Sequence, residues 1–402
     1  MRASILLLSA GCLLAPATAR ADVEWSEPEP GKLAVRFDFS GLDAGDAGAV
    51  ARAYVDDVIL GFLAQAKTRL APPRARALAA HALQVLAGAL EERVRKEAAD
   101  AALARSLLEP RTLVRDEKAL GEDRVRVELA SRIRVQGPED TSEREEERVY
   151  RVELVRGARG WLVESLALPC SACRGSGRCP HRGLPEGESP DRCASCRGSG
   201  ACSPCQGDGF RVADPVGFPI VEGDIPTPPA IDRASPEALV ATYRAAAPRL
   251  AGSVEASLLA GLREDYEQAL GLLLAPAPLA RELEAGREQG KKVLAAAAVV
   301  PPALSVPVKR ELPGGAVEIL AALAGEAADA RAPPYRFVAV PGDSGWRLSA
   351  SGSLCESCAG AGSCELCEGT GTTFRGDKCS RCEGSGKCAA CEGEGYVVEL
   401  FF

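Results

Sequence analysis

The chain has little histidine, a side chain on which many hydrolases and metal-dependent enzymes rely. Its 402 residues include two histidines, His81 and His181. It has no His-Glu-x-x-His pattern, no phosphate-binding glycine loop and no Cys-x-x-Cys-His haem attachment. The protease-like segment Gly342-Asp343-Ser344-Gly345 has no histidine in a suitable arrangement, and its counterpart Gly157–Gly160 has no serine. We therefore expect no catalytic residues.

The chain also lacks an excess of positive charge, and long apolar segments are scarce. Lys and Arg number 48 against 56 Asp and Glu, which gives a net charge of −8. A general nucleic-acid binder needs a basic face, so no nucleic-acid partner is expected. Beyond the N-terminus, no stretch is long and apolar enough to be transmembrane. With 46% hydrophobic and 26% charged residues, the chain is a globular one, long enough for two or more domains.

The segment Met1–Ala21 has the pattern of a secretion signal. Arg2 supplies the positive charge, Ile5–Leu14 a short apolar core, and Ala19-Arg20-Ala21 a cleavage site of small residues. The pattern predicts an exported protein, periplasmic or extracellular, cleaved near Ala21. Two alternatives stay open: a lipoprotein attached to a membrane at Cys12, and an ordinary N-terminal helix.

Cysteine, in contrast, is abundant, with 16 residues in the chain. From Cys355 to Gly395, CESCAGAG, CELCEGTG, CSRCEGSG and CAACEGEG are four tandem copies of C-x-x-C-x-G-x-G. A pair of thiolates two residues apart can hold one metal ion, and the glycines allow the positive φ that directs backbone N–H groups at the sulfurs. The eight thiolates suffice for two four-ligand zinc sites.

A second cluster lies earlier in the chain and contains one damaged copy. Its intact copies begin at Cys170, Cys193 and Cys202, and the damaged copy is Cys179-Pro180-His181-Arg182-Gly183. All four starts precede those of the later cluster by almost the same offset, so one module is used twice. The seven cysteines of this cluster plus His181 make eight possible ligands. A disulfide framework stays open as an alternative to zinc, because export favours oxidised cysteine.

The tandem copies resemble the cysteine-rich zinc finger of the DnaJ co-chaperone family. In that family the first repeat shares a zinc with the fourth, and the second shares one with the third. The resemblance implies up to four zinc ions, held by the following sets: Cys170, Cys173, Cys202 and Cys205; Cys179, His181, Cys193 and Cys196; Cys355, Cys358, Cys388 and Cys391; Cys364, Cys367, Cys379 and Cys382. For the second set, water or a distant side chain in place of His181, and an empty site, remain alternatives. His81 is expected to be structural.

The departures from the DnaJ family limit what the resemblance implies. No His-Pro-Asp tripeptide is present, so the helical hairpin that stimulates a partner ATPase is missing, and there is no Gly/Phe-rich segment. What the resemblance implies is a zinc-stabilised module that binds other polypeptides.

The remaining sequence predicts a mixed fold. Apolar spacing predicts helices over 49–70 and 75–108, separated by Pro72-Pro73, and alternation predicts strands around 125–129, 149–155 and 161–168 with an exposed loop at 137–147. Ser235 and Pro236 begin a further helix, helical sequence continues to about residue 294, and strands follow at 303–312, 316–323, 336–340 and 346–350.

These elements predict an α+β fold built by tandem duplication. Each half has helices, then an antiparallel sheet, then a zinc-stabilised DnaJ-type cysteine-rich hairpin, and the α+β part resembles the cystatin-like fold of the nuclear transport factor superfamily. The expected divisions are a signal peptide (1–21), α+β domain 1 (22–169), zinc module 1 (170–210), a stiff proline-rich linker (211–234), α+β domain 2 (235–354) and zinc module 2 (355–396).

The function expected from these features is the binding of polypeptides by an exported, non-catalytic zinc protein of unknown oligomeric state. Two alternatives stay open: thiol–disulfide exchange by Cys-x-x-Cys pairs, and small-ligand binding by the α+β domains. Arginines are frequent in the first cysteine-rich module and glutamates in the second. This difference indicates either a solvated surface or contact with partners of opposite charge, including the other module.

Overall fold

The structure is a computed structural model. It describes residues 22–29, 32–103, 111–136, 143–179, 199, 201–324 and 334–399. The predicted signal sequence and Cys12 lie outside the described residues. None of the helices in the described ranges is long and apolar enough to cross a membrane.

The chain has an α+β fold with antiparallel sheets, as predicted. A hairpin of β1 (Asp22–Glu29) and β2 (Lys32–Asp38) comes first. Helical elements follow: α1 (Ala47–Ala53), the π-helical η1 (Tyr54–Leu63), α2 (Ala64–Ala82) and α3 (Gly88–Leu103). The first sheet contains β3 (Arg111–Ala119), β4 (Arg124–Gln136), β5 (Glu143–Gly157), β6 (Gly160–Pro169) and β7 (Phe210–Val212), in that order.

The second half has two long helices, α4 (Pro236–Leu273) and α5 (Pro276–Ala298). Its sheet contains β8 (Leu304–Glu311), β9 (Val317–Leu323), β10 (Tyr335–Val340), β11 (Arg347–Leu354) and β12 (Tyr396–Val398). Strand order again follows the chain. In both sheets the cysteine-rich segment connects the fourth strand to the fifth, as a duplicated unit would require; the duplication itself stays a prediction.

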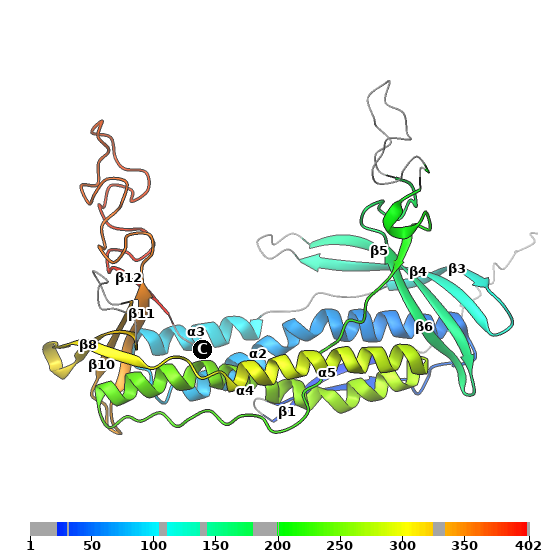
Figure 1. Ribbon diagram of the computed structural model, residues 1–402, viewed down its shortest axis with the longest axis horizontal. Coiled ribbons are helices and arrows are strands. Elements are labelled where there is room, and N and C mark those ends of the chain that lie inside the picture. Colours follow the sequence, from blue (N-terminus) through cyan, green and yellow to red (C-terminus); the bar gives the residue numbers. More distant parts are fainter. Residues whose placement is uncertain are drawn as a thin grey trace, which may run out of the picture.

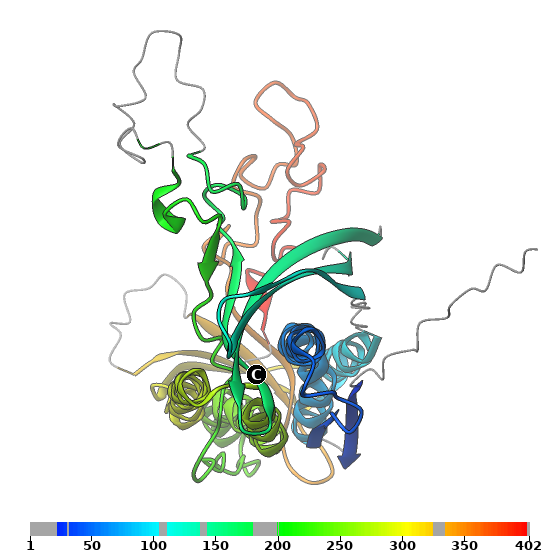
Figure 2. The same cartoon turned by 90° about the vertical axis from the view of Figure 1, so that its right-hand side faces the viewer.

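The helices form one long layer that carries both sheets. Figure 1 shows the second sheet at one end of this layer and the first sheet toward the other, and Figures 1 and 2 show both cysteine-rich segments projecting on the same side, away from the helices. The modules are therefore extensions of the sheets.

Helices and sheets from the two halves share their cores. The first core joins β4–β6 to α1 and η1, and also to the C-terminal half of α4 through Leu262, Tyr266 and Leu270. The second core joins β9–β11 to the N-terminal half of α4, and also to α2 and α3 of the first half. Because α4 belongs to both cores, burial of its apolar face links the two ends of the molecule.

The segment before α4 is extended, as predicted for a linker, but it packs closely. Phe218, Ile220 and Val221 are buried in the first core. Glu282 of α5 accepts hydrogen bonds from the backbone N–H groups of Val216 and Gly217, both at 3.1 Å. Residues 214–222 are therefore a strap fixed along α5. The remainder of the segment contacts α4, where Ser253 donates to the Pro226 carbonyl and Thr242 accepts from the Asp232 N–H.

The helix predicted to start at Ser235 is confirmed. The Ser235 side chain accepts a hydrogen bond from the Ala238 N–H at 3.1 Å, and Pro236 occupies the first helical position. The first N–H groups of a helix have no partner within the helix. The Ser235 side chain supplies a partner for one of them, and Pro236 has no N–H group.

The prediction that Pro72-Pro73 separates two helices is wrong. Both prolines lie inside α2, and the chain instead turns between α2 and α3, before Gly88 with φ +57°. That turn binds β11: Ala87 N–H donates to the Leu348 carbonyl at 2.7 Å, and Leu348 N–H donates to the Val85 carbonyl at 2.8 Å. Contacts with a strand from the other half of the chain decide where this helix ends.

The predicted loop at 137–147 is also partly wrong. Residues 137–142 lie outside the described ranges, whereas Glu143–Glu147 belong to β5 and pair with β4. Glu147 forms ion pairs with Arg115 and Arg132, which lie on the neighbouring strands β3 and β4. Opposite charges across strands allow this polar sequence to extend the sheet.

Candidate metal centres

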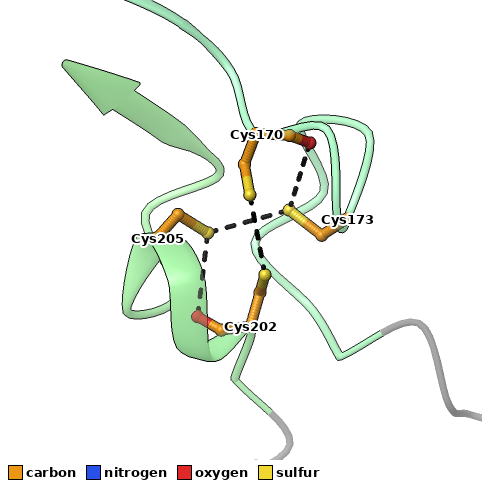
Figure 3. Close-up of side chains that lie close together, drawn as sticks. All are labelled: Cys170, Cys173, Cys202 and Cys205. Atoms are coloured by element: carbon orange, nitrogen blue, oxygen red, sulfur yellow. Dashed lines mark hydrogen bonds between the residues drawn. The ribbon is translucent and has the colours of Figure 1, made fainter. Parts of the chain in front are cut away.

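Three groups of four cysteines come together in the structure. They are Cys170, Cys173, Cys202 and Cys205; Cys355, Cys358, Cys388 and Cys391; and Cys364, Cys367, Cys379 and Cys382. Within each group all four Sγ atoms lie within 4.8 Å of one another. Figure 3 shows the first group, with four sulfurs converging from two separate turns. These groups combine the first repeat with the fourth and, in the second module, the second with the third.

The sulfur separations across each group suit a tetrahedral site of four sulfurs around one metal ion. Cys170 and Cys202 are 3.7 Å apart, as are Cys173 and Cys205. The corresponding pairs in the other two groups are 3.7–3.9 Å apart. A tetrahedron with Zn–S bonds of about 2.3 Å has S···S edges of about 3.8 Å, whereas a disulfide needs about 2.05 Å. The three groups are thus suited to a metal ion and consistent with zinc.

Of the fourth predicted ligand set, the structure describes Cys179 only. This side chain is buried, at 6% exposure. His181, Cys193 and Cys196 lie outside the described residues, so the completion of this site stays a prediction.

The glycine-rich turns direct backbone groups at the sulfurs, as expected from the motif. The last glycine of four repeats donates its N–H to the second cysteine of the same repeat at 3.3 Å, as Gly209 does to Cys205 and Gly371 does to Cys367. Such N–H···S bonds favour the thiolate form, which binds metal.

One feature of the turns is not evident from the motif. The residue directly after each described Cys-x-x-Cys pair has positive φ although it is not glycine; the six examples are Arg174, Gln206, Ala359, Glu368, Glu383 and Glu392, with φ of 47–52°. A non-glycine residue in the left-handed region is uncommon, so each turn is held by its neighbours.

The paired repeats also contact each other through backbone. Cys364 N–H donates to the Gly386 carbonyl at 2.8 Å, and Cys379 N–H donates to the Gly371 carbonyl at 2.9 Å. A Cβ on Gly371 would lie 2.4 Å from the Gly384 carbonyl oxygen. The other two groups have the same exchange and the same close approach. The last glycine is therefore required both for its conformation and for the proximity of the partner repeat.

The thiols of one group have very different acidities. Burial opposes ionisation of Cys382, but hydrogen bonds from the Gly386 N–H and the Cys367 thiol outweigh it and lower the Cys382 pKa to about 6. Burial raises the pKa of Cys364 to about 11. The first group repeats this contrast, with a pKa of about 7 for Cys173 and about 12 for Cys202. One thiolate forms readily, and a cation would be needed to hold four of them together.

An arginine ties each module to its sheet, a role that the sequence did not reveal. Arg151 of β5 donates to Glu128 of β4 at 3.1 Å and to Asp208, in the last repeat of module 1, at 2.6 Å. Its guanidinium carbon also lies 3.8 Å from the Phe210 ring centroid. The base of module 1 is therefore held by both charge and packing.

Arg336 of β10 repeats the arrangement. It contacts Glu318 of β9 at 2.9 Å and Glu394 of the last repeat at 3.2 Å, and lies 6.0 Å from the Tyr396 ring centroid. The arginine, the acid of the last repeat and the aromatic residue follow the same sequence offset as the cysteines, and this could have signalled the pair.

Comparison with protein-family models, curated proteins and solved structures gave no match to this chain.

Proposed function

We propose that this is an exported protein whose two DnaJ-type zinc modules bind other polypeptides without catalysing a reaction. The observation that carries the proposal is the placement of three four-cysteine groups in hairpins that project from the sheets, away from the helical layer. The C-x-x-C-x-G-x-G repeats support the DnaJ-type assignment, and the predicted signal sequence supports export.

Zinc in these sites would be structural. Each described group supplies four sulfurs, so no position is left for a substrate or a water molecule. The ion would cross-link two turns that have few apolar contacts of their own and would counter the charge of the thiolates. Cys179, His181, Cys193 and Cys196 would hold a fourth ion.

Thiol–disulfide exchange is less well supported. That chemistry needs an exposed thiolate that can reach a second sulfur. All cysteines of the three described groups are at most 6% exposed, except Cys358, which is partly buried.

Small-ligand binding in the α+β domains is also less well supported. A cavity beside Tyr54 and Glu282 has a volume of about 50 Å³, below the range of small-molecule sites. A cleft of about 420 Å³ next to Trp346 is open, and the Arg233 guanidinium in it already donates to the Trp346 and Gly345 carbonyls.

Metal content and thiol titration of protein from its native compartment test the zinc assignment. We expect close to four zinc ions per chain, with thiols that react only after chelation. Three ions would mean that the damaged repeat of module 1 is empty. Little zinc together with few reactive thiols would contradict the proposal and favour disulfides.

Polypeptide binding is tested with the full zinc-loaded chain and a reduced, denatured protein that aggregates on dilution. We expect the chain to suppress aggregation and to lose this activity when a chelator removes zinc. The Cys388→Ser variant should lose one zinc site and part of the activity. Equal aggregation with and without the chain would overturn the binding function even if zinc is present.

A further inference from the structure

The tip of the second cysteine-rich module, residues 372–378 between its second and third repeats, carries an aromatic side chain exposed to solvent. Phe374 is 94% exposed, more than any other large hydrophobic side chain among the described residues. Leu366, between the ligand positions Cys364 and Cys367 of the same metal group, is 59% exposed. The equivalent positions in the other two described groups are alanine, proline or serine. A large apolar side chain is therefore not a requirement of this type of turn.

The tip that carries Phe374 is well ordered by backbone contacts. Thr373 N–H donates to the Asp377 carbonyl at 2.8 Å, and Gly376 N–H donates to the Thr373 carbonyl at 2.9 Å. Thr372 and Lys378 pair across the hairpin directly before Cys379. Because the backbone of the hairpin is already held in place, little backbone conformational entropy is lost when its aromatic side chain binds a partner. Side chains that anchor an interface are presented in this way.

The second cysteine-rich module is negative overall, although its tip also carries cations. Residues 355–395 contain seven acidic and four basic side chains, a net charge of −3. Each zinc with four thiolates would add a formal charge of about −2. Glu365, Glu368 and Glu383 are exposed in the turns of the metal group nearest the tip. Three cations lie in the same part of the module: Arg375, 5.3 Å from the Phe374 ring centroid, Lys378, and Arg381, which forms an ion pair with Glu365 at 3.6 Å. The negative balance of residues 364–386 therefore rests on one excess acid and on the thiolates that would hold zinc.

The first module differs in sequence at the same place. Its corresponding central segment, residues 183–192 (GLPEGESPDR), lies outside the described residues and contains no aromatic residue. An aromatic side chain next to acidic turns is therefore a property of the second module and not of the shared motif.

We infer that the tip of module 2, with Phe374 and Leu366 as apolar anchors among acidic side chains, binds polypeptide segments in which apolar residues alternate with lysine or arginine. This inference rests on the proposed polypeptide-binding function. The net negative charge of the module disfavours anionic lipid surfaces, and charge complementarity favours a basic, apolar peptide.

The experiment measures binding of two labelled peptides to the full zinc-loaded chain by fluorescence anisotropy. One peptide alternates leucine with lysine, and the other alternates leucine with glutamate. We expect only the lysine peptide to bind, with Phe374→Ala weakening it at least about tenfold and Phe374→Trp retaining it. Leu113→Ala, which removes a 66% exposed leucine from β3, is the matched control and should bind like the parent chain. Zinc content is measured for every variant.

Several outcomes would overturn the inference. Equal binding of the two peptides would show that charge does not select the peptide. Unchanged binding by Phe374→Ala would show that Phe374 is not an anchor. The proposed polypeptide-binding function would survive both results. Binding to vesicles of phosphatidylcholine and phosphatidylglycerol, lost in Phe374→Ala while the peptides do not bind, would assign the tip to a membrane. A change from oligomer to monomer in Phe374→Ala would assign it to a second copy of the chain. Failure of the parent chain to bind either peptide or a denatured protein would instead contradict the proposed function itself.

Discussion

At the scale of single residues, the last glycine of each repeat explains why the motif is so strict. Gly371 and Gly376 both have positive φ, +77° and +82°, so a side chain is strained at either. Only Gly371 approaches another chain segment: an added Cβ there would lie 2.4 Å from the Gly384 carbonyl oxygen, whereas one on Gly376 would have nothing within 4 Å. Alanine substitutions at the two positions therefore separate the free-energy cost of a side chain at positive φ from the cost of its clash with the partner repeat.

We predict that Gly371→Ala lowers the zinc content of the chain by about one ion, because the two repeats of the Cys364 group can no longer approach each other. Gly376→Ala should keep the full zinc content and destabilise the chain by about 1 kcal/mol through backbone strain alone. Metal analysis after dialysis against a weak chelator measures both. Equal zinc loss in the two variants would mean that backbone strain, not proximity, explains the glycine.

The arginines below the modules are a second determinant at this scale. We predict that Arg151→Ala destabilises the chain by about 1–3 kcal/mol, because Glu128 and Asp208 lose their partner and the Phe210 ring loses a packed cation. Arg151→Lys should recover only part of this stability, since an ammonium group cannot replace the planar guanidinium that contacts both carboxylates and the ring. Urea unfolding gives the stability, and the rate of zinc transfer to a chromogenic chelator reports on the module.

The control for Arg151 is Arg132→Ala on β4. Arg132 is 66% exposed in its side chain and lies 3.9 Å from Glu147, so its removal should change stability by less than about 0.5 kcal/mol. If both substitutions had the same small effect, the contacts of Arg151 would be incidental.

At the scale of secondary-structure elements, helix α5 is shaped by the strap 214–222. A Cβ on Gly290 would lie 1.9 Å from the Ile220 carbonyl oxygen, and one on Gly286 would lie 2.7 Å from the Phe218 carbonyl oxygen. Glycine in a helix usually costs about 1 kcal/mol relative to alanine. Here it allows the strap to lie directly on the helix backbone.

We predict opposite signs for two glycine substitutions in the long helices. Gly290→Ala should destabilise by several kcal/mol, of the order found for overpacked cores, because the strap must move off α5. Gly271→Ala in α4, with nothing within 4 Å of the added Cβ, should stabilise by up to about 1 kcal/mol. Thermal and urea unfolding measure both effects. Stabilisation by both substitutions would show that the strap is not fixed to α5.

The same scale shows what could be predicted from the sequence. Strong local signals predicted the start of α4 at Ser235-Pro236 and the positions of β9 and β10. They failed at Pro72-Pro73, because the packing of Pro73 inside the helical layer and the contacts of Leu86 and Ala87 with β11 decide where α2 ends. They also failed to predict β7 and β12, which are short and depend on pairing with β6 and β11.

At the scale of the whole molecule, the sequence could not show that one helix serves two cores. Leu239 and Tyr243 of α4 belong to the second core, and Leu262 and Tyr266 to the first, but the residues of each pair are four positions apart, as on any buried helix face. The candidate metal groups were easier to predict, because the Cys-x-x-Cys spacing carries the chemistry locally. The arginine contacts at their base depend on three strands and were not predictable from one segment.

Buried tyrosines in both cores give the whole molecule a dependence on alkaline pH. Burial raises the pKa of Tyr54 and Tyr266 in the first core and of Tyr243 in the second, and the nearby Glu282 adds to the effect on the first two. Because the folded pKa lies above the unfolded value of about 10, the contribution to stability is complete below that pH and is lost as pH rises above it.

We predict that the free energy of unfolding falls above about pH 10 by up to about 1.4 kcal/mol per pH unit for each of these tyrosines. The phenolate absorbance of Tyr54, taken as the difference between the parent chain and Tyr54→Phe, should appear together with loss of tryptophan fluorescence from the native state. Tyr54→Phe should make the fall less steep. Phenolate formation in the intact fold near pH 10 would show that these tyrosines are accessible.

Each cysteine-rich module leaves and re-enters its sheet at neighbouring positions. Pro169 pairs with Phe210 on adjacent strands, and Leu354 pairs with Tyr396. The outer part of a segment whose two ends already meet can be lengthened, shortened or exchanged without changing the path of the rest of the chain, because, among the described residues, the sheet contacts the segment only at those ends and at the acid of its last repeat. Sequence change beyond the base of a module is therefore uncoupled from the core, and the outer parts of the two modules can diverge on an unaltered scaffold.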